Sequence, residues 1–159
     1  MPRLLALVLT AAAALTVEEE LDAAYPCFSE AIALRATCSC ATIDLSNRGL
    51  QGTIPPTLAL CEDLSALDLR GNGIVGTIPE ALSALPRLSR LGLSNNRLTG
   101  AIPSIARSVT HLSLHHNNLT GTIPRAIGAL ASLNYLCVPR ARARAVSYTH
   151  LTLPTIPLV

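Results

Sequence analysis

The segment LDLRGNGIVGTIPEALSALPRL, which begins at Leu67, recurs in varied form through much of this 159-residue chain. Related copies begin at Ile43 (IDLSNRGLQGTIPPTLALCEDL), Leu91 (LGLSNNRLTGAIPSIARSV) and Leu112 (LSLHHNNLTGTIPRAIGALASL), and a partial fifth begins at Leu136. Successive copies start 24, 24, 21 and 24 residues apart. A fixed period of this length predicts a solenoid, in which each repeat packs only against its neighbours.

Two kinds of position in the repeat are predicted to be structural. Side chains alternate along a strand, so both leucines of each LxL segment point inward and stack into one core, in the pairs Leu67/Leu69, Leu91/Leu93 and Leu112/Leu114. An asparagine follows each strand in three repeats, at Asn72, Asn96 and Asn117. Its amide can satisfy backbone groups in the turn, so we interpret this column as structural. Arg48 occupies the equivalent place in the first repeat.

The GxIP segment predicts the route from the strand to the outer side of the solenoid. Glycine permits a tight turn there, at Gly52, Gly76, Gly100 and Gly121. The prolines that follow fix φ and lead into a turn or short 3₁₀ segment. In the third repeat only five residues separate Pro103 from Val109. We expect this shortening to fall on the convex side and to leave the strand face intact.

The pattern LxLxxNxLxGxIPxxLxxLxxL resembles the plant-type leucine-rich repeat family, which includes receptor ectodomains and inhibitors of secreted hydrolases. The resemblance covers residues 41–138, as four repeats and a partial fifth. It implies an α/β solenoid: a right-handed superhelix with parallel concave strands, a 3₁₀ or irregular convex side and an N-terminal helical cap.

Composition narrows the classes of function. Aromatic residues make up only 3% of the chain, which disfavours an aromatic sugar-binding groove and indicates an aliphatic core. The net charge of +2 gives no basic stripe for nucleic acid or a membrane surface. No phosphate loop, paired catalytic carboxylates or nucleophile elbow is present. We therefore expect neither an enzyme nor a cofactor.

The N-terminus predicts entry into the secretory route. Residues 1–16 contain Arg3, an apolar run and alanines at 12–14 that suit cleavage of a signal peptide. The apolar run is too short for a comfortable membrane span, which disfavours an anchoring helix. Glu18 to Leu34 has helical periodicity, with a break expected before Cys27 because Pro26 interrupts it.

Residues 17–40 are similar to the helical cysteine cap that covers the first repeat in plant-type proteins. The resemblance implies a disulfide within the set Cys27, Cys38 and Cys40, with Cys27 paired to either of the other two. A zinc site is disfavoured because four ligands at CxxC spacing are missing. We interpret Cys61, on the convex side, as a small buried hydrophobic residue.

Outward positions of the strands form the predicted binding face. The residues that we expect to contact a protein or peptide ligand are Asp44, Asp68, Arg70, Arg90, His111, Ser113, His115 and Tyr135. His111 and His115 lie about 13 Å apart on one strand, too far to share a metal ion. Adjacent His115 and His116 have poor geometry for a shared ligand. Asp68 and His111 lie roughly 10 Å apart, which disfavours a catalytic triad.

Two features concern processing and the C-terminus. Asn118-Leu119-Thr120 is an N-glycosylation sequon at a surface turn. Residues 139–159 are expected to be non-native, because the period stops and Val146 to Thr155 resembles the translation of a transposon-end sequencing adapter. On this interpretation the solenoid is truncated in its fifth repeat.

The sequence therefore predicts a recognition module from a secreted or cell-surface receptor-like protein, located outside the cell and tied to a membrane only through a missing downstream segment. The alternatives are a secreted inhibitor of extracellular hydrolases and the regulatory ectodomain of a receptor kinase whose catalytic part is missing. A span downstream favours a receptor, whereas a capped end favours an inhibitor.

Overall fold

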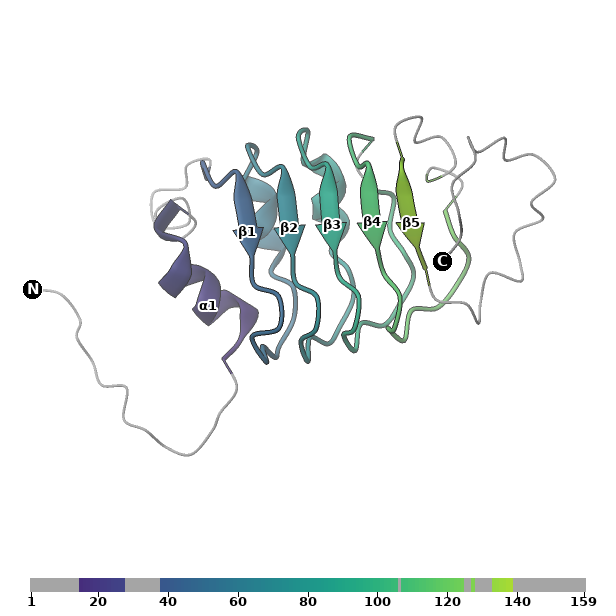
Figure 1. Ribbon diagram of the computed structural model, residues 1–159, viewed down its shortest axis with the longest axis horizontal. Coiled ribbons are helices and arrows are strands. Elements are labelled where there is room, and N and C mark those ends of the chain that lie inside the picture. The colour runs from purple at the N-terminus through teal and green to yellow at the C-terminus, as the bar shows by residue number, and fades with distance from the viewer. Residues whose placement is uncertain (1–14, 28–37, 106, 125–126, 128–132, 139–159) are drawn as a thin grey trace, which may run out of the picture.

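Each repeat contributes one three-residue strand centred on the first apolar residue of its LxL segment. A computed structural model describes residues 15–27, 38–105, 107–124, 127 and 133–138. Its strands are β1 (Thr42–Asp44), β2 (Ala66–Asp68), β3 (Arg90–Gly92), β4 (His111–Ser113) and β5 (Tyr135–Cys137). They form one parallel sheet in chain order (Figure 1), which confirms the predicted solenoid.

The strands pair in the register that the repeat period predicts. Ile43, Leu67, Leu91, Leu112 and Leu136 are successive partners across the sheet. One outward column therefore contains Thr42, Ala66, Arg90, His111 and Tyr135, and the next contains Asp44, Asp68, Gly92 and Ser113. Cys137, which pairs with Ser113 in β5, is buried. The short third repeat leaves the register between β3 and β4 unchanged, as expected.

The core is a stack of aliphatic side chains. The leucine pairs of the second, third and fourth repeats are all buried, together with Leu58, Leu64, Leu82 and Leu88 from the outer side. Repeating this layer makes a continuous core without large aromatic residues, because each repeat covers the apolar surface of the one before it.

The asparagine column satisfies backbone groups, as predicted. Asn72 accepts hydrogen bonds from the backbone N–H groups of Arg48 and Leu50 through its Oδ1, and its Nδ2 donates to carbonyls of two repeats. Asn96 and Asn117 repeat this arrangement one and two turns further on. In the first repeat, Arg48 instead extends its guanidinium to the cap, where it forms a 3.0 Å ion pair with Glu20.

On the convex side, two short 3₁₀ helices lie behind the sheet in the view of Figure 1. They are η1 (Pro56–Leu60) and η2 (Glu80–Ala84), and each follows the proline of a GxIP segment, as expected. Gly76 is the first residue of the GxIP segment that leads into η2, and its φ is 80°. A residue with a side chain would be strained in this backbone conformation. Both helices bury their central leucine against the core.

A short N-terminal helix covers the first strand. Helix α1 (Val17–Ala24) starts with a capping box, in which Thr16 and Glu19 exchange hydrogen bonds. Val17 and Leu21 are fully buried against the core. The helix ends at Ala24, and Tyr25 is its C-terminal cap. This end lies directly before Pro26, where the sequence predicts a break. The Tyr25 hydroxyl donates to the carbonyl of Asp44 and accepts from its N–H, which satisfies the outer edge of β1.

Two disulfides hold the cap, one within it and one that joins it to the first repeat. Cys27 is bonded to Cys40, one of the two pairings that the sequence left open. Cys38 is bonded to Cys61 on the convex side, so the interpretation of Cys61 as a mere buried hydrophobic residue is wrong. The backbone explains the second bond, because the N–H of Cys38 donates to the carbonyl of Leu60, the immediate neighbour of Cys61.

Several expectations fall outside the described residues. These are most of the predicted signal peptide, the helical pattern beyond Cys27 and the proposed non-native tail at 139–159. Leu15 and Thr16 are described, and both contact Gln51 at the edge of the fold through backbone hydrogen bonds or strand pairing. Among the described residues, no helix is long and apolar enough to span a membrane.

Candidate ligand-binding face

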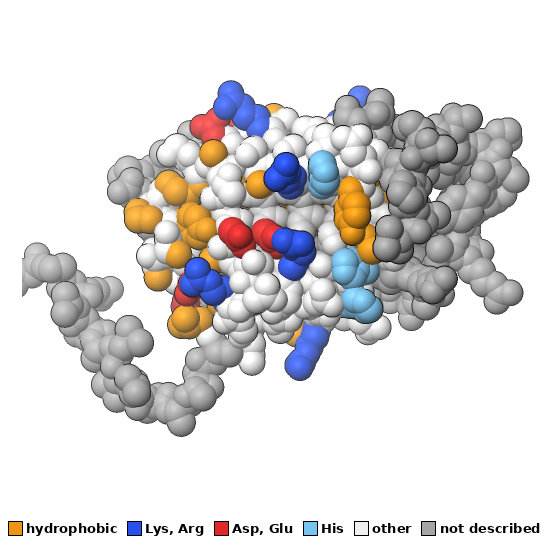
Figure 2. Space-filling model, viewed as in Figure 1, with side chains coloured by type: hydrophobic (Ala, Val, Ile, Leu, Met, Phe, Trp, Pro, Cys, Tyr) orange, Lys and Arg blue, Asp and Glu red, His pale blue; other side chains and the backbone are white. Residues whose placement is uncertain are grey.

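The exposed face of the sheet carries a hollow of about 420 Å³. Its walls come from all five strands, and its lining includes Asp44, Asp68, Arg70, Arg90, His111, Ser113 and Tyr135. Figure 2 shows acidic, basic and histidine side chains gathered over these strands. The structure thus brings together seven of the eight residues predicted as ligand contacts, and His115 lies next to them in sequence.

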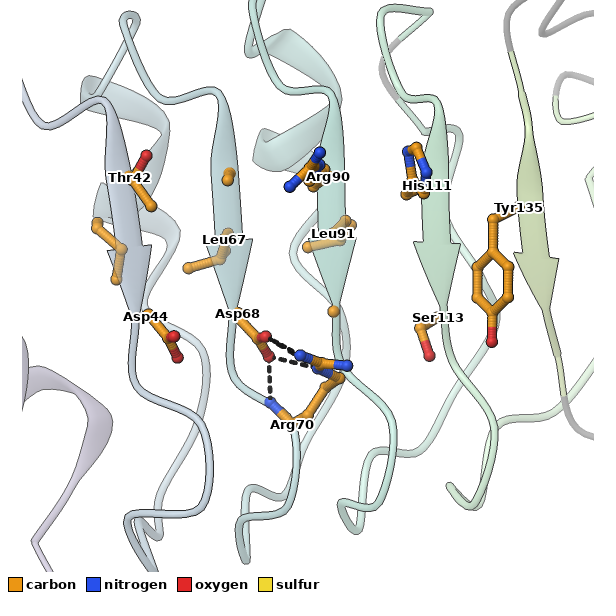
Figure 3. Close-up of a pocket in the computed structure, with 13 residues that line it drawn as sticks. Thr42, Asp44, Leu67, Asp68, Arg70, Arg90, Leu91, His111, Ser113 and Tyr135 are labelled. Carbon is orange, nitrogen blue, oxygen red and sulfur yellow. Dashed lines mark hydrogen bonds and ion pairs between the residues drawn. The ribbon is translucent and has the colours of Figure 1, made fainter.

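Asp68 and Arg70 form a two-pronged ion pair in the middle of this hollow (Figure 3). The Nε of Arg70 donates to both carboxylate oxygens of Asp68, at 2.8 and 2.9 Å, and Nη2 also donates to Oδ2. The hydrogen bonds to this carboxylate raise the pKa of Arg70. Both charges are therefore largely engaged with each other.

Gly92 makes room for that pair. A Cβ atom at this position would lie 3.0 Å from Oδ1 of Asp68 and 3.2 Å from the Cγ and Cδ atoms of Arg70. The absence of a side chain therefore allows the arginine to fold across the neighbouring strand. Sequence reasoning missed this role, although a glycine at an outward strand position is the signal that could have indicated it.

Asp44 faces the same hollow from the first strand, but no arginine among the described residues is bonded to it. Its Oδ1 accepts a 3.0 Å hydrogen bond from the backbone N–H of Ser46. This bond lowers the pKa of Asp44, and the more distant positive charges of Arg70 and Arg48 lower it further. The carboxylate therefore stays ionised at mildly acidic pH.

Arg90 supplies positive charge on the third strand. Its side chain is exposed and reaches the hollow. Within the described part of the chain it makes no ion pair or side-chain hydrogen bond. Its guanidinium thus retains five donors for an incoming acceptor.

Ring systems line the C-terminal side of the face. His111 and Tyr135 lie side by side with ring centroids 6.4 Å apart and an angle of 21° between their planes. The Nδ1 atom of His111 lies 2.9 Å from the hydroxyl of Thr110, and Nδ1 of His115 lies 3.2 Å from the hydroxyl of Ser113. Ser94, an outward position between Arg70 and His115, is buried rather than exposed, because a short side chain between two long ones is easily covered.

The pKa of His115 is expected to lie below that of an ordinary histidine. Burial lowers its pKa from 6.5, and the neighbouring His116 and Arg70 act in the same direction. The folded chain then binds fewer protons than the unfolded chain between that lowered value and 6.5. This contribution to stability is present in full above pH 6.5 and is lost as pH falls through the window.

The measurement is a proton NMR titration of the imidazole signals, with His115 assigned by the signal that disappears in His115→Gln. We expect a midpoint below 6.5. A midpoint at or above that value would contradict the assigned environment. Urea unfolding at several pH values gives the free energy of unfolding as a function of pH. In His115→Gln this free energy should lack the part of the pH dependence that the titration of His115 contributes.

The described residues bring one group of three metal-ligating side chains together. The sulfur atoms of Cys27, Cys38 and Cys40 lie within 4.8 Å of one another. All three cysteines are engaged in disulfides, Cys27 with Cys40 inside this set and Cys38 with Cys61 outside it. Asn118, the predicted glycosylation site, is exposed at the edge of the fourth repeat.

A family model described as Leucine Rich Repeat matches residues 63–85, 87–107 and 108–130. These matches coincide with the second, third and fourth turns of the solenoid. The chain therefore contains leucine-rich repeats. No curated protein matches the sequence.

Solved structures of plant receptor ectodomains resemble the leucine-rich repeat chain. The BIR2 ectodomain from Arabidopsis thaliana is 41% identical, with 60% of this chain and 52% of that chain covered and a TM-score of 0.57. A TDR receptor is 29% identical, with 65% and 18% covered and a TM-score of 0.62. The ectodomain of the Arabidopsis receptor kinase HAESA, in complex with an IDA peptide hormone, is 29% identical, with 63% and 17% covered and a TM-score of 0.59.

The leucine-rich repeat chain thus spans about half or less of the length of these structures. They agree with the plant-type assignment made from the repeat pattern. Two disulfides in a small cap also fit the oxidising environment outside the cell, where such receptor ectodomains are found.

Proposed function

We propose that the chain is the N-terminal part of a secreted or cell-surface receptor-like protein that binds a protein or peptide ligand without catalysing a reaction. The observation that carries this proposal is the hollow on the strand face, lined by polar and charged side chains from every strand. A peptide can contact successive columns there, because the outward residues of neighbouring strands stand about 4.8 Å apart.

The similar structures support this proposal. One is a receptor ectodomain in complex with a peptide hormone, and another is a complex between BIR3 and SERK2, 39% identical to this chain over 61% of it with a TM-score of 0.58. His111 and His115 contact the hydroxyls of Thr110 and Ser113, but within the described residues no carboxylate is bonded to either imidazole, so the third group of a catalytic triad is missing there.

The test is selection of peptides by the immobilised, disulfide-bonded full chain from a displayed library of random decapeptides. Ala66→Trp should reduce recovery of the enriched peptides at least about tenfold, because the indole occupies the hollow that Ala66 lines. Ala84→Trp is the matched control, since Ala84 is exposed on η2 behind the sheet. Equal recovery by the two variants, or no enrichment by the unmodified chain, would contradict the proposal.

A further inference from the structure

The charges of the hollow are unevenly paired. Asp68 and Arg70 neutralise each other through several hydrogen bonds. Within the described residues the carboxylate of Asp44 accepts hydrogen bonds only from Ser46 and forms no ion pair, and Arg90 keeps its whole guanidinium. One negative and one positive group are therefore available to a ligand.

These two groups belong to the strands on either side of β2, the strand that carries Asp68. Asp44 belongs to β1 and Arg90 to β3, and the register places them two residues apart along the strand direction. Two strand spacings of about 4.8 Å and two residue rises of about 3.3 Å separate their backbones by roughly 12 Å. Figure 3 shows the two side chains on the same face, with Asp68 between their strands.

The surface between the two groups is open to a backbone. Arg70 fills the space over Gly92, but Ala66, which pairs with Arg90 across the sheet, has only a methyl group. No large side chain therefore stands over β2 at the level of Arg90. Beyond Arg90, the paired rings of His111 and Tyr135 form a less polar wall. An elongated ligand that crosses the strands meets a negative group, a neutral centre and a positive group in turn.

We propose that the hollow recognises an extended peptide segment that carries a basic residue over Asp44 and an acidic residue over Arg90. An extended chain advances about 3.3–3.6 Å per residue, so a distance of roughly 12 Å corresponds to a spacing of three or four residues. Each contact is a charge-assisted hydrogen bond, which is stronger than one between neutral groups. This inference rests on the proposed function, because it names the ligand class for the same face.

The experiment uses the same decapeptide library with the full chain and two variants that remove one charge each, Asp44→Asn and Arg90→Gln. The unmodified chain should enrich peptides with Lys or Arg three or four residues from Asp or Glu. Asp44→Asn should lose the basic preference and keep the acidic one, and Arg90→Gln should do the reverse. Asparagine can still accept the N–H of Ser46, so the local turn is preserved.

A synthetic copy of the most enriched peptide gives the quantitative test. Asp44→Asn should weaken its binding about tenfold, and should have little effect on a copy whose basic residue is replaced by glutamine. Asp22→Asn on α1 and Arg97→Gln in the third repeat are matched controls on exposed residues outside the hollow, and both should bind like the unmodified chain.

Three outcomes would overturn this inference. Enriched peptides without the spaced charges would do so, as would selections that Asp44→Asn and Arg90→Gln leave unchanged. Each of these two results leaves the proposed function in place, provided that Ala66→Trp still reduces recovery of the enriched peptides at least about tenfold. Failure of the unmodified chain to enrich any peptide would overturn the inference together with the proposed peptide-binding function.

Discussion

Leu93→Asp is expected to unfold the chain under conditions in which the unmodified chain is folded. Leu93 is fully buried in the middle repeat, and its backbone N–H bonds to the next strand at Ser113. Truncating a buried leucine already costs about 2–5 kcal/mol. An uncompensated buried carboxylate adds a desolvation cost of several kcal/mol, and a typical domain has only about 5–15 kcal/mol of stability.

Urea unfolding followed by far-ultraviolet circular dichroism measures this effect. Leu93→Met conserves volume and should cost less than about 1.5 kcal/mol. Arg97→Asp introduces the same carboxylate at an exposed position of the same repeat and should stay within about 0.5 kcal/mol of the unmodified chain. An unfolding midpoint for Leu93→Asp close to that of Arg97→Asp would contradict the continuous core described above.

The repeat period made the strands, their register and the core predictable. Once Leu67 and Leu91 are one period apart, stacking their repeats places them side by side, and the alternation of side chains decides which neighbours face solvent. Asn72 was equally predictable, because a turn with unpaired backbone groups needs a side chain that both donates and accepts. These inferences succeeded because each depends on a local rule that is repeated along the chain.

Interactions that occur once in the chain could not be inferred in that way. In the first repeat Arg48 occupies the place that asparagine holds in the later repeats, which interrupts the asparagine column. The partner of Arg48 is Glu20, which lies in the cap and outside the repeat pattern. The ion pair between Arg70 and Asp68 depends on the volume that is free because Gly92 has no side chain, and the distances between residues in the sequence do not reveal this. The sequence therefore predicted which residues share the strand face, whereas the pairing of their charges required coordinates.

Cys61 is the clearest case of a partner that the sequence did not specify. It lies 23 residues after Cys38 and inside the first repeat, so the cap pattern offered no reason to pair them. The pairing follows from the backbone hydrogen bond between Cys38 and Leu60, which brings the cap onto the convex segment. This bond ties the cap to the solenoid, because Cys27–Cys40 alone closes a loop that ends just before β1.

Replacing both Cys38 and Cys61 by alanine is expected to destabilise the chain by about 3 kcal/mol, the chain-entropy value for a loop of this length. The double variant is preferred because a single one leaves a thiol near the Cys27–Cys40 bond, where exchange can reshuffle the pairs. Urea midpoints compared with and without reductant measure the loss. The unmodified chain should lose more stability on reduction than the double variant, which retains only one disulfide.

Proteolysis of the unreduced chain followed by mass spectrometry tests the connectivity itself. A linked fragment pair should join Cys38 to Cys61, and a second should join Cys27 to Cys40. A link between Cys27 and Cys38, the other pairing that the sequence allowed, would contradict the structure. Cys40 would then be left to pair with Cys61, and a linked fragment pair would join those two cysteines instead.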